Sequence, residues 1–299
     1  MSVIHSTWPR PIAKSAIFLK RLCCTAGNTA NTRPIGRPST IKRRRNTVSN
    51  IPELVLCIPG PWEESSVLAD EIALSAIGYS LVGNVLRDSE TGFACELVLQ
   101  RADQALADDF RKAGPHWATT VAMADIEDHR SVAYLVAPGG SREAADAMMR
   151  AGAALVDSGG LGVKVDSTGI AHAPAYWIDM CEQLDQLTAH RALVVYVAGA
   201  EVYSCGMHNF GLPEAITSGG DKTQAADMLR FFTRYLLEHA PQLEDGHTFS
   251  VSEGKPVYRV ERTEAIDYGE GSLFNNPYGA WRLVPLVPEK KGNWWSRKR

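Results

Sequence analysis

The sequence predicts an α+β protein with mixed or antiparallel sheets and helices, arranged as two ferredoxin-like (split βαβ) halves. Two observations predict this class. Short apolar runs typical of buried strands alternate with amphipathic helical repeats from residue 52 onward. Near the carboxyl end, three strand-like runs follow one another without an intervening helix, which favours α+β over a strictly alternating α/β fold.

The first predicted half spans residues 51–137. Its pattern gives the order β-α-β-β-α-β, which is typical of the split βαβ arrangement. The segment 117–130 interrupts that order before the last strand. The predicted elements are a buried strand at 53–59, a helix at 64–78, a hairpin formed by 79–88 and 93–100, a helix at 103–114 and a strand at 131–139.

The second predicted half spans residues 138–287 and has longer helices. The clearest is the helix at 221–240, where Asp221 and Gln224 are placed as a capping pair before an apolar stripe that includes Phe232 and Leu236. The other predicted elements are helices at 141–160 and 173–184 and strands at 161–166, 191–203, 246–252, 256–262 and 279–286.

The two ends differ from the body in charge. Residues 1–50 carry ten basic residues and no acidic one, which predicts a disordered basic segment, and residues 288–299 form a basic tail. A wrongly assigned start, a transit peptide and a functional basic arm remain open for the first segment. Residues 51–289 hold 16 basic residues against 34 acidic ones, so the folded domain is not expected to bind nucleic acid.

Membrane insertion and cofactor binding are not expected. The longest apolar run is far short of the ~20 residues that span a bilayer. The six cysteines lack the paired spacing of a disulfide framework, and no secretory signal precedes them, so we expect reduced thiols in a cytoplasmic protein. G-x-S-x-G, H-E-x-x-H and G-x-G-x-x-G are all missing from the sequence, and no cofactor is predicted.

The stretch EVYSCGMHNFGLPEA, residues 201–215, holds the candidate site. Cys205 is a candidate nucleophile, with His208 or His247 as its base. Cys205 and His208 also form a C-x-x-H half-site for zinc, but a second ligand pair with recognised spacing is missing, so no metal site is predicted. A tight structural turn, in which Asn209 closes the chain, is the third interpretation.

Polar and aromatic residues near two other strands are candidate binding residues. Asp245 precedes one strand, and Asn276, Tyr278 and Trp281 lie in the stretch LFNNPYGAWRL, where they would either line a polar pocket or pack a turn. Because each block follows or precedes a strand of the second half, we expect these residues to meet Cys205 and Asn209 at one end of its sheet.

Three blocks carry a family resemblance: YSCGMHNFGLPEA, DGHTFSVSEG and FNNPYGAWRL. In this order and spacing they resemble the bacterial family labelled domain of unknown function 4261, over about residues 51–287. Since that family has no established activity, the resemblance implies a bacterial cytoplasmic protein and no particular chemistry.

Two classes of function follow from the sequence. The first is a non-catalytic binding or regulatory protein, of the kind that immunity proteins represent, which docks a protein partner through its acidic surface. The alternative is a hydrolase or transferase that uses Cys205 with His208 or His247. The absence of a complete catalytic motif favours the first.

Overall fold

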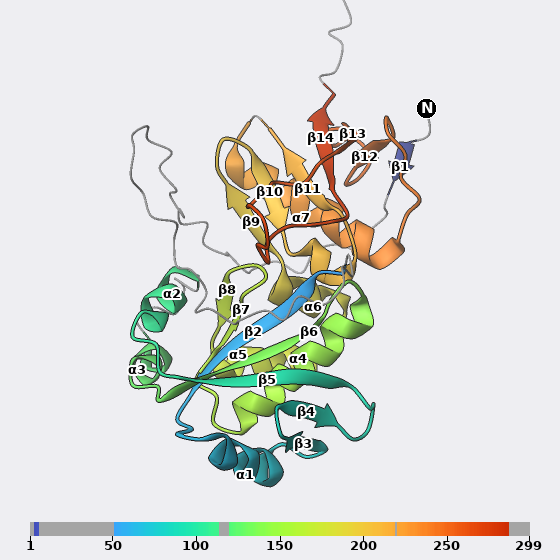
Figure 1. Cartoon of the computed structure of the whole chain (residues 1–299). Helices are drawn as coiled ribbons and strands as arrows, with labels where there is room; N and C mark the ends of the chain where they lie inside the picture. The colour runs from blue at the N-terminus through green and yellow to red at the C-terminus, as the bar shows by residue number, and fades with distance from the viewer. Residues whose placement is uncertain (1–2, 6–50, 114–119, 219, 287–299) are drawn as a thin grey trace, which may run out of the picture.

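A computed structural model describes residues 3–5, 51–113, 120–218 and 220–286 (Figure 1). These residues form seven α-helices, one 3-10 helix and two seven-stranded sheets, which confirms the α+β class. The predicted basic tail and all of the predicted N-terminal segment except β1 (Val3–His5) lie outside the described residues.

The first sheet has the strand order β3-β4-β5-β6-β2-β7-β8, with every neighbouring pair antiparallel. Its inner strand β2, between β6 and β7, is buried on both faces. Leu54, Leu56 and Ile58 face one apolar cluster, whereas Val55 and Cys57 face another, because successive side chains of a strand point to opposite faces. The strands are β2 (Glu53–Gly60), β3 (Tyr79–Val82), β4 (Val85–Asp88), β5 (Ala94–Arg101), β6 (Ser131–Pro138), β7 (Val163–Val165) and β8 (Ile170–His172).

Helices cover both faces of this sheet. Apolar residues of α1 (Ser65–Ser75) and α4 (Arg142–Asp157) belong to the cluster that contains Leu54. Those of α2 (Leu106–Ala113) and α3 (Val121–Glu127) belong to the cluster that contains Val55. The double cover explains why β2 is an almost unbroken apolar run.

The first half differs from its prediction in connectivity. Residues 79–88 form two strands rather than one, because Gly83, at φ 64°, makes a tight turn with Asn84. The ferredoxin-like arrangement is not confirmed, since β6 lies between β2 and β5. The first sheet also continues past residue 137 into β7 and β8, and the interrupting segment contains α3.

The second sheet has the order β1-β12-β13-β14-β11-β10-β9 and is mixed, with β1–β12 and β11–β14 parallel. Helix α7 (Lys222–His239) lies against β9, β10 and β11. Its bounds agree with the predicted helix. The remaining strands are β9 (Val195–Ala198), β10 (Val202–Cys205), β11 (Glu214–Thr217), β12 (Thr248–Ser250), β13 (Tyr258–Thr263) and β14 (Ala280–Pro285).

The predicted long strand at 191–203 is wrong. Helix α6 (Gln186–Leu193), which Asp185 caps through the backbone N–H of Thr188, occupies its start. The rest is the β9–β10 hairpin, which turns at Gly199. The end of α6 at Leu193 and the turn at Gly199 therefore divide the apolar run that the sequence pattern joined. Helix α5 (Pro174–Glu182) precedes α6, as predicted for residues 173–184.

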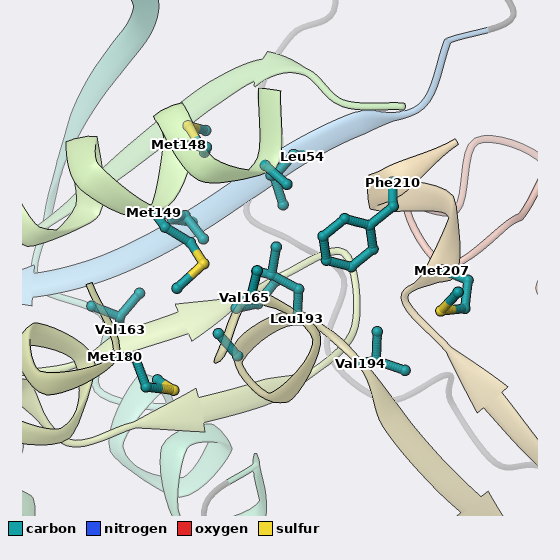
Figure 2. Packing of buried hydrophobic residues seen from close by; sticks show 14 of the residues in the cluster. Leu54, Met148, Met149, Val163, Val165, Met180, Leu193, Val194, Met207 and Phe210 are labelled. Carbon is teal, nitrogen blue, oxygen red and sulfur yellow. The ribbon is translucent and has the colours of Figure 1, made fainter. Parts of the chain in front are cut away.

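One apolar core joins the two sheets. The 3-10 helix η1 (Met207–Phe210) lies between β10 and β11 and contacts α4. Figure 2 shows Phe210 directed into the cluster that holds Leu54, Val165 and Leu193. The candidate stretch of the sequence is thus part of the junction between the sheets.

Candidate functional site

The turn between β10 and β11 depends on two glycines. Gly206 has φ 126°, and a Cβ there would lie 2.1 Å from the carbonyl oxygen of Leu193. Gly211 has φ 75°, and a Cβ there would lie 2.3 Å from the carbonyl oxygen of Gly140. L-amino acids with a side chain rarely adopt such angles, so both glycines are required by the backbone path.

A buried carboxylate, Glu214, organises this turn. Its Oε2 accepts a hydrogen bond from Ser204 Oγ at 2.6 Å. Its Oε1 accepts from the backbone N–H of Gly206 at 3.0 Å, His208 Nδ1 at 3.2 Å and Asn276 Nδ2 at 2.9 Å. We call these five residues the Glu214 cluster; because the acceptor is a carboxylate, Nδ1 of His208 carries the hydrogen.

The hydrogen bonds keep Glu214 ionised. Burial by itself raises the pKa of this carboxyl. The hydrogen bond and charge of His208, together with the hydrogen bonds from Ser204 and Asn276, outweigh burial and lower the pKa below its ordinary value. A buried charge with this many donors is typical of an anchor that fixes the backbone around it.

Cys205 lies beside this cluster but has the wrong electrostatics for a nucleophile. It is 3% exposed. Burial raises the pKa of its thiol, the charge of Glu214 raises it further, and a hydrogen bond from Tyr268 lowers it only in part. An activated thiol needs the opposite shift. In the described part of the chain, no hydrogen bond joins Cys205 to His208 or His247.

His208 is fully buried. Its Nδ1 is engaged with Glu214, and its Nε2 has no hydrogen-bond partner among the residues that the structure describes. Orphaned buried nitrogens of this kind are uncommon and are often explained by a water molecule or by strain.

Asn209 ties the turn to the first sheet. Its Oδ1 accepts a hydrogen bond from Ser167 Oγ at 3.0 Å, and its Nδ2 donates to the carbonyl oxygen of Leu193 at 3.4 Å. Its own carbonyl oxygen accepts from the backbone N–H of Gly140. Asn209 is fully buried, so these polar groups serve the junction between the sheets.

Tyr278 and Trp281 make backbone and packing contacts near this junction. The backbone N–H of Tyr278 donates to Asn276 Oδ1 at 2.8 Å. Trp281 is 7% exposed, and the guanidinium of Arg262 lies over its ring at 4.8 Å. Of the residues taken from the stretch LFNNPYGAWRL, Asn276 is the one that reaches the Glu214 cluster.

Asp245 and His247 lie at the same end of the second sheet but far across it. Asp245 Oδ1 accepts from the backbone N–H of Arg262 at 2.6 Å, and His247 Nδ1 accepts from the backbone N–H of Glu244 at 3.2 Å. Their strand β12 is separated from β10 by β13, β14 and β11. Four strand spacings amount to about 19 Å, so His247 is not placed beside Cys205.

His172, on β8 of the first sheet, bonds through Nε2 to the carbonyl oxygen of Ala192 on α6 at 2.9 Å. Within the described ranges, no group of three or more His, Cys, Asp or Glu residues is arranged to hold a metal ion.

Two hollows adjoin the cluster. A cavity of about 10 Å³, lined by residues that include Cys205, Glu214 and Tyr268, has room for about one water molecule. An open depression of about 280 Å³ lies outside it, lined by residues 264–267, 275–277 and 279. Residues 265 and 266 line both hollows, and Asn276, which donates to Glu214, also lines the outer depression.

Sequence reasoning missed Ser204, Glu214 and Tyr268. The available signal was Glu214 itself, which is a charged residue at the start of the otherwise apolar run EAI. A buried charge requires several donors, and such a requirement points to a polar cluster whose other members lie elsewhere in the chain.

The fold and this cluster define an α+β protein with a buried carboxylate anchor. The family model described as "Domain of unknown function (DUF4261)" matches residues 203–276, which contain the whole Glu214 cluster. The match confirms the predicted resemblance over a shorter range than residues 51–287. No curated protein and no solved structure was found to match the chain. Among the described helices, none combines the length and apolar character needed to cross a membrane.

Proposed function

We propose that this protein is a non-catalytic binding or regulatory protein of the cytoplasm that docks a protein partner through its acidic surface. One observation carries the proposal: the cavity beside Cys205 and Glu214 has about 10 Å³. Ligand pockets commonly have about 300–1,000 Å³. A substrate therefore has no room beside the candidate nucleophile.

The bonding of the candidate catalytic residues supports the same conclusion. Cys205 has a raised pKa, and His208 is bonded to a carboxylate that also holds the turn. If His208 left Glu214 to act as a base, both buried groups would lose a hydrogen bond, which costs stability. Burial of Cys205 and the hydrogen bond of His208 are therefore consistent with a structural role for both side chains.

Charge supports a protein partner. The folded body has 34 acidic and 16 basic residues, and such an excess attracts partners with a basic surface while it repels nucleic acid and anionic membranes.

Thiol reactivity tests this proposal. The full-length protein is alkylated under native conditions over a range of pH, and the modification of each cysteine is followed by mass spectrometry. We expect Cys205 to react as slowly as the buried Cys57, and more slowly than the half-buried Cys181, because a thiol that is neutral and covered reacts slowly.

The variant His247→Ala is the control for the alternative hydrolase or transferase. We expect it to leave the alkylation rate of Cys205 unchanged, since His247 lies several strands away. Rapid reaction of Cys205 with a low apparent pKa, slowed in His247→Ala, would refute the proposal and support the alternative.

A further inference from the structure

Four exposed apolar side chains lie between residues 67 and 82, on α1, just after it and at the end of β3. Val67 is 44% exposed, Leu74 79%, Ile77 98% and Val82 74%. They are four of the nine large apolar residues that are exposed in the described part of the chain, and they all lie on α1, directly after it, or at the end of β3. Single exposed apolar residues are ordinary, whereas a group of them indicates an interaction surface.

Two of these residues, Val67 and Leu74, lie on one face of α1, while Ile77 follows the helix and Val82 ends β3. Val67 and Leu74 are seven positions apart with Asp70 and Glu71 between them, and positions i, i+3, i+4 and i+7 share one side of a helix. The opposite side carries Leu68 and Ile72, which are fully buried. Three helical turns extend about 16 Å, which is enough for a facing helix to pack along this side.

The surrounding surface is acidic. Between residues 63 and 96 the chain has seven acidic residues and one basic residue, Arg87. Glu63 is paired with Arg130, whereas Glu64, Asp70 and Glu71 are exposed and form no ion pair with any described residue. The apolar side chains are therefore bordered by carboxylates that are free to meet cations.

Charge also decides between occupants. A second copy of this chain would bring the same carboxylates face to face, and an anionic lipid surface would be repelled in the same way.

Figure 1 shows α1 with β3 and β4 at the end of the molecule away from β13 and β14, so the face is remote from the Glu214 cluster.

We propose that α1 and the β3–β4 hairpin form a docking face for an amphipathic helix of a partner protein, with an apolar stripe flanked by lysine or arginine. This inference rests on the proposed binding function and names its surface. The partner's apolar stripe covers Val67, Leu74 and Ile77, while its cations meet Glu64, Asp70 and Glu71.

The probe for this face is a synthetic amphipathic helix of leucine and lysine, labelled with a fluorophore and titrated with the full-length protein at about 150 mM salt. We expect Leu74→Ser combined with Ile77→Ser to weaken binding by about tenfold or more. We expect Asp70→Asn combined with Glu71→Gln to reduce the association rate and its salt dependence. Because all four residues are exposed, these variants should keep the wild-type melting temperature.

The matched control is Val121→Ser on α3, which removes an apolar side chain that is 79% exposed outside the proposed face. It should bind the probe as the wild type does. Equal weakening by Val121→Ser, or no weakening in the α1 variants, would overturn the inference. A dimer of the free protein that Leu74→Ser and Ile77→Ser dissociate would also overturn it, because the occupant would then be a second copy. Tighter probe binding after deletion of residues 1–50 would overturn it as well, because the basic N-terminal segment of the same chain would then be the occupant. None of these outcomes depends on Cys205, so they leave the alkylation test of the proposed function independent.

Discussion

Glu214→Gln should destabilise the fold by about 3 kcal/mol at neutral pH. The carboxylate accepts three short hydrogen bonds, from Ser204 Oγ at 2.6 Å, Asn276 Nδ2 at 2.9 Å and Gly206 N at 3.0 Å. A hydrogen bond contributes about 1 kcal/mol net, and more when one partner is charged. Glutamine keeps one acceptor oxygen, but its NH₂ group would face a donor that it cannot satisfy.

The cost should depend on pH in a defined direction. The pKa of Glu214 is lowered from its ordinary value of 4.5 in the folded protein. A lowered pKa means that the stabilisation is present above the unfolded pKa and is lost as the pH falls through the folded pKa. The difference in stability between wild type and Glu214→Gln should therefore be full near neutral pH and shrink as the pH falls below about 4.5.

Urea denaturation of the full-length protein at several pH values measures both effects. The matched control is Glu201→Gln, which makes the same substitution in the partly exposed ion pair with Arg282. Exposed ion pairs contribute about 0–1 kcal/mol, so the control should cost no more than that. The reasoning is refuted if Glu214→Gln costs no more than the control, or if its cost does not change with pH.

Two further predictions concern packing and the turn, and the same denaturation measurement checks them. Phe232→Ala should cost about 3–5 kcal/mol, because Phe232 is fully buried with its ring 5.0 Å from that of Phe249, whereas Phe231→Ala, at a position 43% exposed, should stay within about 0.5 kcal/mol. Gly206→Ala should cost about 3 kcal/mol or more, because its new Cβ would lie 2.1 Å from a backbone carbonyl oxygen; Gly83→Ala, with positive φ but nothing within 4 Å, should cost about 1 kcal/mol. Equal costs within either pair would contradict the assigned environments.

Helix α7 could be predicted because its signals are local. Asp221 accepts hydrogen bonds from the backbone N–H of Thr223 and Gln224, which confirms its half of the predicted capping pair, and Phe232 and Leu236 are buried on the predicted stripe. The buried stripe ends before His239, whose side chain is 52% exposed at the end of the helix. Helix caps and helical periodicity depend on residues that are close together in the sequence, so they can be recognised without knowing the fold.

Strand order could not be predicted in the same way. The position of β6 between β2 and β5 depends on pairings between residues far apart in the chain. The β3–β4 turn, by contrast, has a local signal, since a Gly83–Asn84 pair inside an apolar run indicates a hairpin. Because β3 and β4 pair as a hairpin, the first half has one strand more than the split βαβ order contains.

The candidate site failed to emerge from the sequence for a different reason. A Cys-x-x-His spacing shows that a thiol and an imidazole are close in the chain, but their burial and hydrogen bonds in the fold determine whether they can react. Cys205 faces a nearly closed cavity, and His208 is held by a glutamate six residues later. Another donor to that glutamate, Asn276, comes from a loop 62 residues further on. The charge on Glu214 required such a donor, and only the fold could say which residue supplies it.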